Sequence, residues 1–479
     1  MLLAVMVSML LTVAGCTPNT AFRQSAEVPS VACVQSDNAP FPESCRRTFT
    51  ETTPDYDLHF VEFDDQGWRY PDAAEIHRDP LRDQAAKQLD TVMDRLRTAA
   101  DRRPMRLFVF IHGWKHNAAF DDTNVVNFRN FLREAAAYEH VAESPARVAR
   151  LYVGWRGKSW DVGEPFASST FWDRKATALQ VAIGSMRELT AELRALQRHA
   201  NRTNADARAK DISIPDQKVR VYLIGHSFGA LVLFNAVSQS LVNSFVEGED
   251  IDSKNSPVDR LGDMIVLINP AFEATRFEPL DRVARKRSYF HYQSPVFVSI
   301  TSDADNATGR LFPLGRTINT IFESELTNAE RSANRNTIGH IPAYITHRLT
   351  LDAARNRCND WVVNPKGDAQ MINNVLQESQ NSLEFKSSLV DGGWPSAPGD
   401  KPAERVFCGG LVLQPLGKDT PTARKADPNM PLWNITLTGD IVPDHNDINE
   451  EIFRAFLRQL FLDEAVNRRF MMLPPALPR

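Results

Sequence analysis

Several features are scarce or missing in this 479-residue sequence, and each absence excludes a class of protein. The formal net charge is −5, so the chain lacks the basic excess that nucleic-acid binding requires. Its five cysteines show no C-x-x-C pair and no Cys/His spacing typical of zinc sites, so a zinc site is not expected. No internal repeat is present. The 43% hydrophobic and 24% charged residues are those of an ordinary globular protein.

Residues 1–15 form an apolar stretch that is too short to span a bilayer comfortably and that ends in Val13-Ala14-Gly15-Cys16. These small residues before a cysteine resemble the lipobox of a bacterial lipoprotein signal peptide, although no Lys or Arg precedes the apolar core. The resemblance implies that residues 1–15 are removed and that Cys16 carries a lipid anchor at the outer membrane, facing the periplasm. An ordinary secretory signal and a buried N-terminal segment are the alternatives.

Four further cysteines remain after Cys16, an even number that fits disulfides in an oxidising periplasm. Three pairings are possible. Cys33 with Cys45 and Cys358 with Cys408 are favoured because each pair closes a local loop, which is worth about 3–4 kcal/mol in the chain-entropy model.

The rest of the chain divides into two parts. Residues 16–55 are polar and aperiodic, so they are predicted to be a tether followed by a disulfide-stapled lead-in. Residues 56–479 are predicted to form one domain, with an insertion at about 306–430 where strand signals are weak. Strand and helix patterns alternate in this domain, which predicts an α/β fold with a mostly parallel central sheet and helices on both faces. The expected strands are Tyr56–Phe63, Arg106–Ile111, Val148–Trp155, a strand from Val219, Met264–Ile268, Val296–Thr301 and Trp433–Thr438; the expected helices are Leu81–Ala100, Thr123–Tyr138, Thr170–His199 and Glu450–Leu462.

Ser227 is the candidate nucleophile. It stands in Gly225-His226-Ser227-Phe228-Gly229, between an apolar strand pattern and an Ala/Leu-rich helical pattern. A sharp turn between strand and helix leaves the hydroxyl exposed, and the two glycines leave room for a cramped backbone. The alternative is that Ser227 only caps the following helix.

A serine hydroxyl is a weak nucleophile at neutral pH, so it needs a histidine base and a carboxylate that orients the base. Of the eleven histidines, only His445 lies between the last predicted strand and the closing helix. His340 and His347 are alternatives, although their place inside the insertion favours structural roles. His226 stands beside the nucleophile and is expected to pack rather than to transfer a proton.

With these residues the chain resembles the α/β-hydrolase superfamily, in which the triad runs in the order Ser, Asp or Glu, His. The resemblance covers roughly residues 106–462. It implies Asp305 as the acid, in the turn after the strand that ends at Thr301 and at a spacing similar to the family's. Asp303 in the same turn and Glu273 after the preceding strand remain alternatives, and an Asp pair that merely caps a turn is a third reading.

The same resemblance places an oxyanion hole at the backbone N–H groups of Trp114 and Phe228. Phe228 follows the nucleophile and opens a helix, whose dipole favours negative charge. Trp114 belongs to His112-Gly113-Trp114, which occupies the position of the family's HG motif. Three other tryptophans either line an acyl pocket or pack in the core: Trp155, Trp160 and Trp172.

Together, these expectations predict a lipid-anchored serine hydrolase at the cell envelope. It would cleave a carboxylic ester, of a small molecule or a lipid, through an acyl-enzyme intermediate, and this mechanism requires no metal or other cofactor. An amidase, a thioesterase or a phospholipase would use the same triad. A non-catalytic envelope binding protein that retains the fold is the alternative from another class. The oligomeric state stays open.

Overall fold

A computed structural model describes most of the chain. The described residues are 20–25, 43–70, 87–141, 144–158, 171–211, 217–247, 258–286, 289, 293–320, 323–358, 373–374, 377–385, 404–416 and 429–471. The predicted signal peptide, the predicted lipid site Cys16, and two further residues of interest, Cys33 and Trp160, lie outside these ranges.

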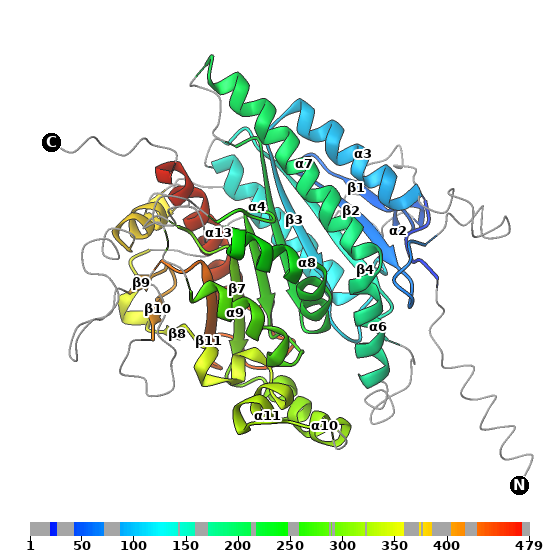
Figure 1. Ribbon diagram of the computed structural model, residues 1–479. Helices are drawn as coiled ribbons and strands as arrows, with labels where there is room; N and C mark the ends of the chain where they lie inside the picture. Colours follow the sequence, from blue (N-terminus) through cyan, green and yellow to red (C-terminus); the bar gives the residue numbers. More distant parts are fainter. Residues whose placement is uncertain are drawn as a thin grey trace, which may run out of the picture.

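One sheet runs through the described residues (Figure 1), with the strand order β1-β2-β4-β3-β5-β6-β7-β11-β8-β10-β9. Neighbours from β2 to β8 pair in parallel, and the remaining pairs are antiparallel. All seven expected strands are present, with bounds shifted by at most one residue. The strands are β1 Thr50–Thr52, β2 Tyr56–Phe63, β3 Met105–Ile111, β4 Arg147–Trp155, β5 Val219–His226, β6 Met264–Ile268, β7 Phe297–Ser302, β8 His347–Leu351, β9 Arg405–Val406, β10 Leu411–Pro415 and β11 Leu432–Leu437.

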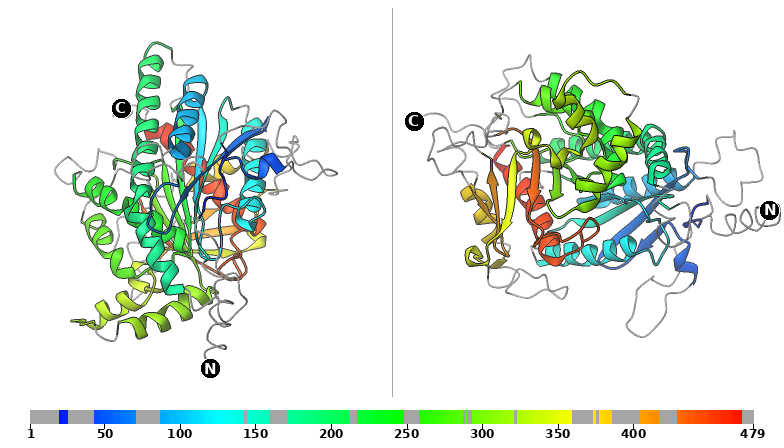
Figure 2. Two further views of the ribbon diagram at one scale, coloured as in Figure 1. Left: turned by 90° about the vertical axis from the view of Figure 1, so that its right-hand side faces the viewer. Right: turned by 90° about the horizontal axis from the view of Figure 1, so that it is seen from below.

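Helices cover both faces of the sheet (Figure 2): α3 and α6 to α9 pack on one face, and α4 and α13 on the other. This covering explains why the strand patterns are mostly apolar on both faces, because β4, β5 and β6 are buried along their whole length. The protein is therefore a mixed α/β protein. The helices are α2 Glu43–Arg46, α3 Lys87–Arg102, α4 Thr123–Val141, α6 Phe171–Ile183, α7 Ser185–Arg208, α8 Phe228–Glu247, α9 Glu278–Ala284, α10 Phe312–Asn319, α11 Asn328–Arg335 and α13 Glu451–Met471.

Among the described helices, α8 alone is long and apolar enough to cross a membrane by composition. It packs against β5 and β3, and 56% of its most apolar window is buried. It has the position of a core helix.

The single helix expected over Thr170–His199 is instead two helices, α6 and α7, which meet at Gly184. The loop after β2 interrupts it. A Cβ at Gly184 would lie 2.4 Å from the carbonyl oxygen of Gly67, and that oxygen accepts the N–H of Ser185 over 2.9 Å. A contact from a distant loop replaces a hydrogen bond inside the helix, which local periodicity does not reveal.

The predicted insertion adds both helices and strands. β8, β10 and β9 extend the sheet beyond β11, so the strand that is last in sequence lies in the interior of the sheet. These strands are short and β8 is only partly buried, which explains their weak sequence signal. α10 and α11 lie past the carboxyl ends of the parallel strands (Figure 1). The expected disulfide between Cys358 and Cys408 is present, with 5.3 Å between the Cα atoms.

Candidate active site

Ser227 occupies the junction of β5 and α8 with a backbone φ of +55°, a left-handed conformation that a non-glycine residue rarely adopts. The flanking glycines make this turn possible. A Cβ at Gly225 would lie 2.7 Å from the carbonyl oxygen of Gly229, and a Cβ at Gly229 would lie 2.1 Å from that of Ile111. Only glycine fits at both positions, so the G-x-S-x-G spacing has a steric cause.

The structure brings Ser227, His445 and Asp305 together. Nε2 of His445 lies 2.7 Å from Oγ of Ser227, and Nδ1 of His445 lies 2.8 Å from Oδ2 of Asp305. Each residue comes from a loop or turn after a different parallel strand, β5, β7 or β11, whose carboxyl ends share one edge of the sheet. Asp305 and Ser227 are buried, whereas the side chain of His445 is 12% exposed.

In the hydrogen-bonded series of Ser227, His445 and Asp305, the proton positions follow from which atoms can donate and which can only accept. Burial alone would raise the pKa of Asp305, but hydrogen bonds from His445 and Thr308 bring it below its ordinary value. The ionised carboxylate only accepts, so Nδ1 of His445 carries the proton. Nε2 of neutral His445 then accepts the hydroxyl of Ser227, which is the arrangement that a general base requires.

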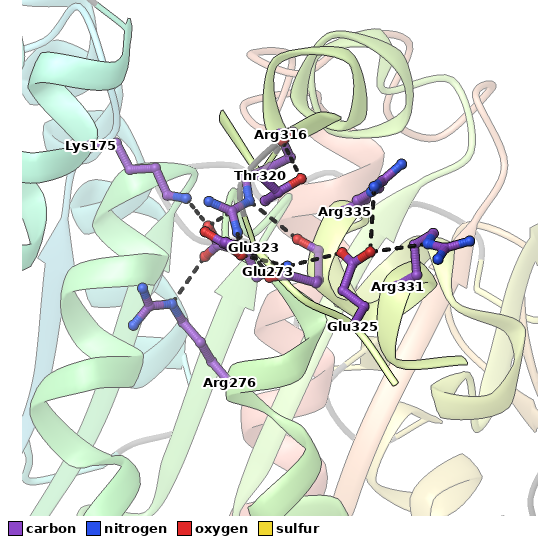
Figure 3. A network of polar contacts seen from close by, with 10 residues as sticks. Lys175, Glu273, Arg276, Arg316, Thr320, Glu323, Glu325, Arg331 and Arg335 are labelled. Atoms are coloured by element: carbon purple, nitrogen blue, oxygen red, sulfur yellow. Dashed lines mark hydrogen bonds and ion pairs between the residues drawn. The ribbon is translucent and has the colours of Figure 1, made fainter. Parts of the chain in front are cut away.

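The alternative acids lie elsewhere. Asp303 is exposed, and among the described residues its carboxylate has no hydrogen-bond partner. Glu273 is buried and forms ion pairs with Lys175, Arg276 and Arg316 (Figure 3). Burial would raise the pKa of Glu273, but these cations lower it to about 2. Neither carboxylate contacts His445.

The side chains of His226 and Asn269 hold the backbone of His445, a contact that the sequence did not predict. Nε2 of His226 and Nδ2 of Asn269 each lie 3.0 Å from the carbonyl oxygen of His445. Asn269 follows β6 with a φ of +44°, and its Oδ1 accepts the N–H of Ser302 over 3.0 Å. A polar residue directly after a buried strand, at the edge where Ser227 lies, is the sequence signal that marks Asn269.

The backbone N–H groups of Trp114 and Phe228 have no acceptor within the part of the chain that the structure describes. A Cβ at Gly113 would lie 2.9 Å from Cβ of Ser227, so the loop that carries Trp114 passes directly beside the serine. The ring of Phe171 packs between those of Trp114 and Phe228, with centroid distances of 5.3 and 4.7 Å. The three rings therefore form one apolar cluster, to which both residues that carry the free N–H groups contribute.

Three buried donors fix the carbonyl groups of this loop, residues 114–122. The hydroxyl of Tyr152 donates to Asn117 over 3.0 Å, Nε of Arg23 to Ala118 over 2.8 Å, and Nη1 of Arg129 to Phe120 over 2.8 Å. Both arginines also pair with one carboxylate, that of Glu51. The predicted tether thus contains a residue, Arg23, that is 1% exposed and contacts the loop beside Ser227.

The remaining candidates have structural partners. Trp155 stacks on His112 and donates from its indole nitrogen to the His112 carbonyl over 2.9 Å. Trp172 packs against Phe312 of α10. Burial lowers the pKa of His347, a residue of β8, to about 3. In the described residues, no group of three or more His, Cys, Asp or Glu side chains could hold a metal ion.

No protein-family model matches the sequence, and no curated protein matches it. Among solved structures, the chain is similar to a YdeN-like hydrolase from Pectobacterium atrosepticum at 17% identity. The match covers 45% of this chain and 71% of the other, with a TM-score of 0.14. A likeness at this TM-score carries no argument. The function is therefore inferred from the geometry of the site.

Proposed function

We propose that this chain is a serine hydrolase of the α/β-hydrolase type that cleaves a carboxylic ester through an acyl-enzyme intermediate. The observation that carries the proposal is the hydrogen-bonded series from Ser227 through His445 to Asp305. Two further features support it: the left-handed turn that presents Ser227, and the free N–H groups of Trp114 and Phe228 beside it.

In the proposed reaction, Oγ of Ser227 attacks the ester carbonyl carbon while Nε2 of His445 takes the hydroxyl proton. The N–H groups of Trp114 and Phe228 donate to the oxygen that becomes negative. His445 then gives its proton to the leaving alkoxide, and an acyl ester remains on Ser227. Water, deprotonated by His445, attacks this ester, and the acid leaves as Ser227 regains its proton. Asp305 stays ionised and stabilises the imidazolium form of His445.

The proposed substrate class is an ester of a small molecule or a lipid with an apolar acyl group. Phe171 supports this choice, because its ring packs against the rings of both Trp114 and Phe228, the residues that carry the two proposed donors.

A fluorophosphonate probe, which bonds covalently to an activated serine, tests the proposal. The wild-type protein should be labelled, Ser227→Ala should not, and Ser332→Ala, which changes an exposed serine of α11, should be labelled like the wild type. Equal labelling of wild type and Ser227→Ala would overturn the assignment of the nucleophile. No labelling of the wild type would favour the binding-protein alternative.

The location at the cell envelope is part of the proposal and depends on the sequence around Cys16. Metabolic labelling with an alkynyl fatty acid should mark the wild-type protein and leave Cys16→Ser unmarked. Labelling of both proteins would exclude Cys16 as the lipid site.

A further inference from the structure

Two residues that the proposed reaction does not use extend the hydrogen-bonded series beyond Asp305. Oγ1 of Thr308 donates to Oδ2 of Asp305 over 2.5 Å, and the N–H of Thr308 donates to Oδ1 over 3.1 Å. Nε2 of His340 lies 3.1 Å from the same hydroxyl oxygen of Thr308. Both oxygens of Asp305 are thus engaged, and five side chains form one continuous series.

The direction of these hydrogen bonds follows from the number of protons. The ionised carboxylate of Asp305 only accepts, so the single hydroxyl proton of Thr308 points toward it. The Thr308 oxygen is then left as an acceptor, and Nε2 of His340 must carry a proton to donate to it. Donors aligned in this way polarise one another, which strengthens each bond in the series.

The backbone on either side of this contact is closely packed. Thr308 is 1% exposed and lies in a π-helical turn, Ala307–Leu311, of the kind that recurs at functional sites. The ring of His340 lies against Gly309, where a Cβ would be 3.0 Å from its Cε1 atom. A side chain at position 309 would displace the histidine from Thr308.

His340 comes from η4 (Ile338–His340), a turn of the predicted insertion that rests on the main sheet. A Cβ at Gly339 would lie 2.0 Å from Oγ1 of Thr301 in β7, so η4 approaches β7 as closely as glycine allows. From β11, Nδ2 of Asn434 donates to the carbonyl of Ile338 over 2.9 Å. The two strands that precede Asp305 and His445 therefore also position His340.

Ion pairs hold the helix that follows the π-helical turn. Arg316 of α10 pairs with Glu273 over 3.2 Å, and Lys175 and Arg276 pair with the same carboxylate (Figure 3). Glu323 pairs with Arg316 over 3.5 Å and accepts from Nδ2 of Asn334 in α11 over 2.8 Å, which joins α11 to this network. The helix that directly follows the segment with Thr308 is thus held against Glu273.

We propose that Thr308 and His340 are positioning residues that act through Asp305. They hold the carboxylate in the orientation in which Oδ2 meets Nδ1 of His445, with His340 acting on Asp305 only by way of the Thr308 hydroxyl. The inference rests on the proposed function, because it assigns to both residues an effect on the base of that reaction.

Matched variants at Thr308 separate the hydroxyl from the shape of the side chain. Thr308→Val keeps the shape and removes the donor, so kcat for p-nitrophenyl acetate should fall about tenfold with KM within about twofold. Thr308→Ser keeps the donor and should recover kcat to within about threefold of wild type. Thr317→Val, which removes a hydroxyl bound to the Pro313 carbonyl in α10, is the control and should leave kcat unchanged.

A double-mutant cycle tests the route from His340. His340→Leu should lower kcat by about fivefold in the wild type, and His340→Gln, which keeps an N–H donor, should lower it less. In the Thr308→Val background, His340→Leu should have no further effect. Additive losses would overturn the proposed route, and a wild-type kcat in Thr308→Val would overturn the positioning role itself.

The rate of fluorophosphonate labelling distinguishes a failure of this inference from a failure of the proposed function. If labelling requires Ser227 but proceeds at the wild-type rate in Thr308→Val, the function stands and the inference is wrong. If labelling does not require Ser227, the proposed function itself is wrong. Circular dichroism of each variant separates lost folding from lost positioning.

Discussion

His226 and His445, 219 residues apart in sequence, are joined by a hydrogen bond from Nε2 of His226 to the backbone carbonyl oxygen of His445 over 3.0 Å. A carbonyl only accepts, so Nε2 of His226 carries the proton. Burial, reinforced by the neighbouring His445, lowers the pKa of His226 to about 3, which keeps its ring neutral. Its Nδ1 atom is then unprotonated, and a Cβ at Gly113 would lie 3.1 Å from it. The residue before the nucleophile thus helps to place the proposed base.

His226→Leu removes this donor while keeping much of the side-chain volume. We expect kcat/KM for p-nitrophenyl acetate to fall about tenfold, because the His445 carbonyl keeps only its bond from Asn269. His226→Gln retains an N–H group at a similar distance from the backbone and should lose less. Equal losses in the two variants would show that packing, rather than the hydrogen bond, is what His226 contributes.

Substitutions of Asp303 and Asp305, which share one turn, should have sharply different effects on kcat/KM. Asp305→Asn should lower kcat/KM about 10³- to 10⁴-fold, since an amide cannot hold His445 in the required tautomer. Asp303→Asn is the matched control and should stay within about twofold of wild type, because its carboxylate is exposed. Steady-state kinetics measure both, and similar losses at the two positions would contradict the assignment of the acid.

Gly113→Ala tests the loop that carries Trp114. The added methyl group would lie 2.9 Å from Cβ of Ser227 and 3.1 Å from Nδ1 of His226, so either the loop or the serine must move. We expect fluorophosphonate labelling to slow by about 100-fold, because a donor displaced from the oxyanion costs about that much. Labelling at the wild-type rate would show that this loop supplies no donor.

The charged network around Glu273 makes stability depend on pH. The pKa of Glu273 is about 2 in the folded protein against an ordinary value of 4.5, so its contribution is present above pH 4.5 and is lost as pH falls toward 2. Glu273→Gln should therefore lower the free energy of unfolding by roughly 3 kcal/mol at pH 7. This difference should shrink below pH 4.5.

Urea unfolding of wild type and Glu273→Gln between pH 7 and pH 3 measures this dependence. Glu247→Gln, a change at an exposed position at the end of α8, is the control and should show no such trend. A constant difference between wild type and Glu273→Gln at all pH values would mean that packing rather than charge accounts for the loss.

The sheet could be predicted from local patterns, and the candidate site residues could be predicted from those patterns together with the family resemblance. A strand that helices cover on both faces is mostly apolar, so β3 to β7 and β11 are visible as short, predominantly apolar runs. Parallel strands bring their carboxyl ends to one edge, where the glycine-flanked turn marked Ser227 and position marked His445. Asp305 was preferred to Asp303 only through the family resemblance. β8 to β10 gave little signal because they are short.

Tertiary structure alone decided the contacts that join distant segments. Asp303 and Asp305 share a turn and a charge, and only the approach of His445 and Thr308 distinguishes them. The break at Gly184, the burial of Arg23 and the pairing of Glu273 likewise depend on segments far away in sequence. Local periodicity records which face of a strand or helix is buried, but a hydrogen bond or an ion pair forms only where folding brings its two partners within about 3 Å.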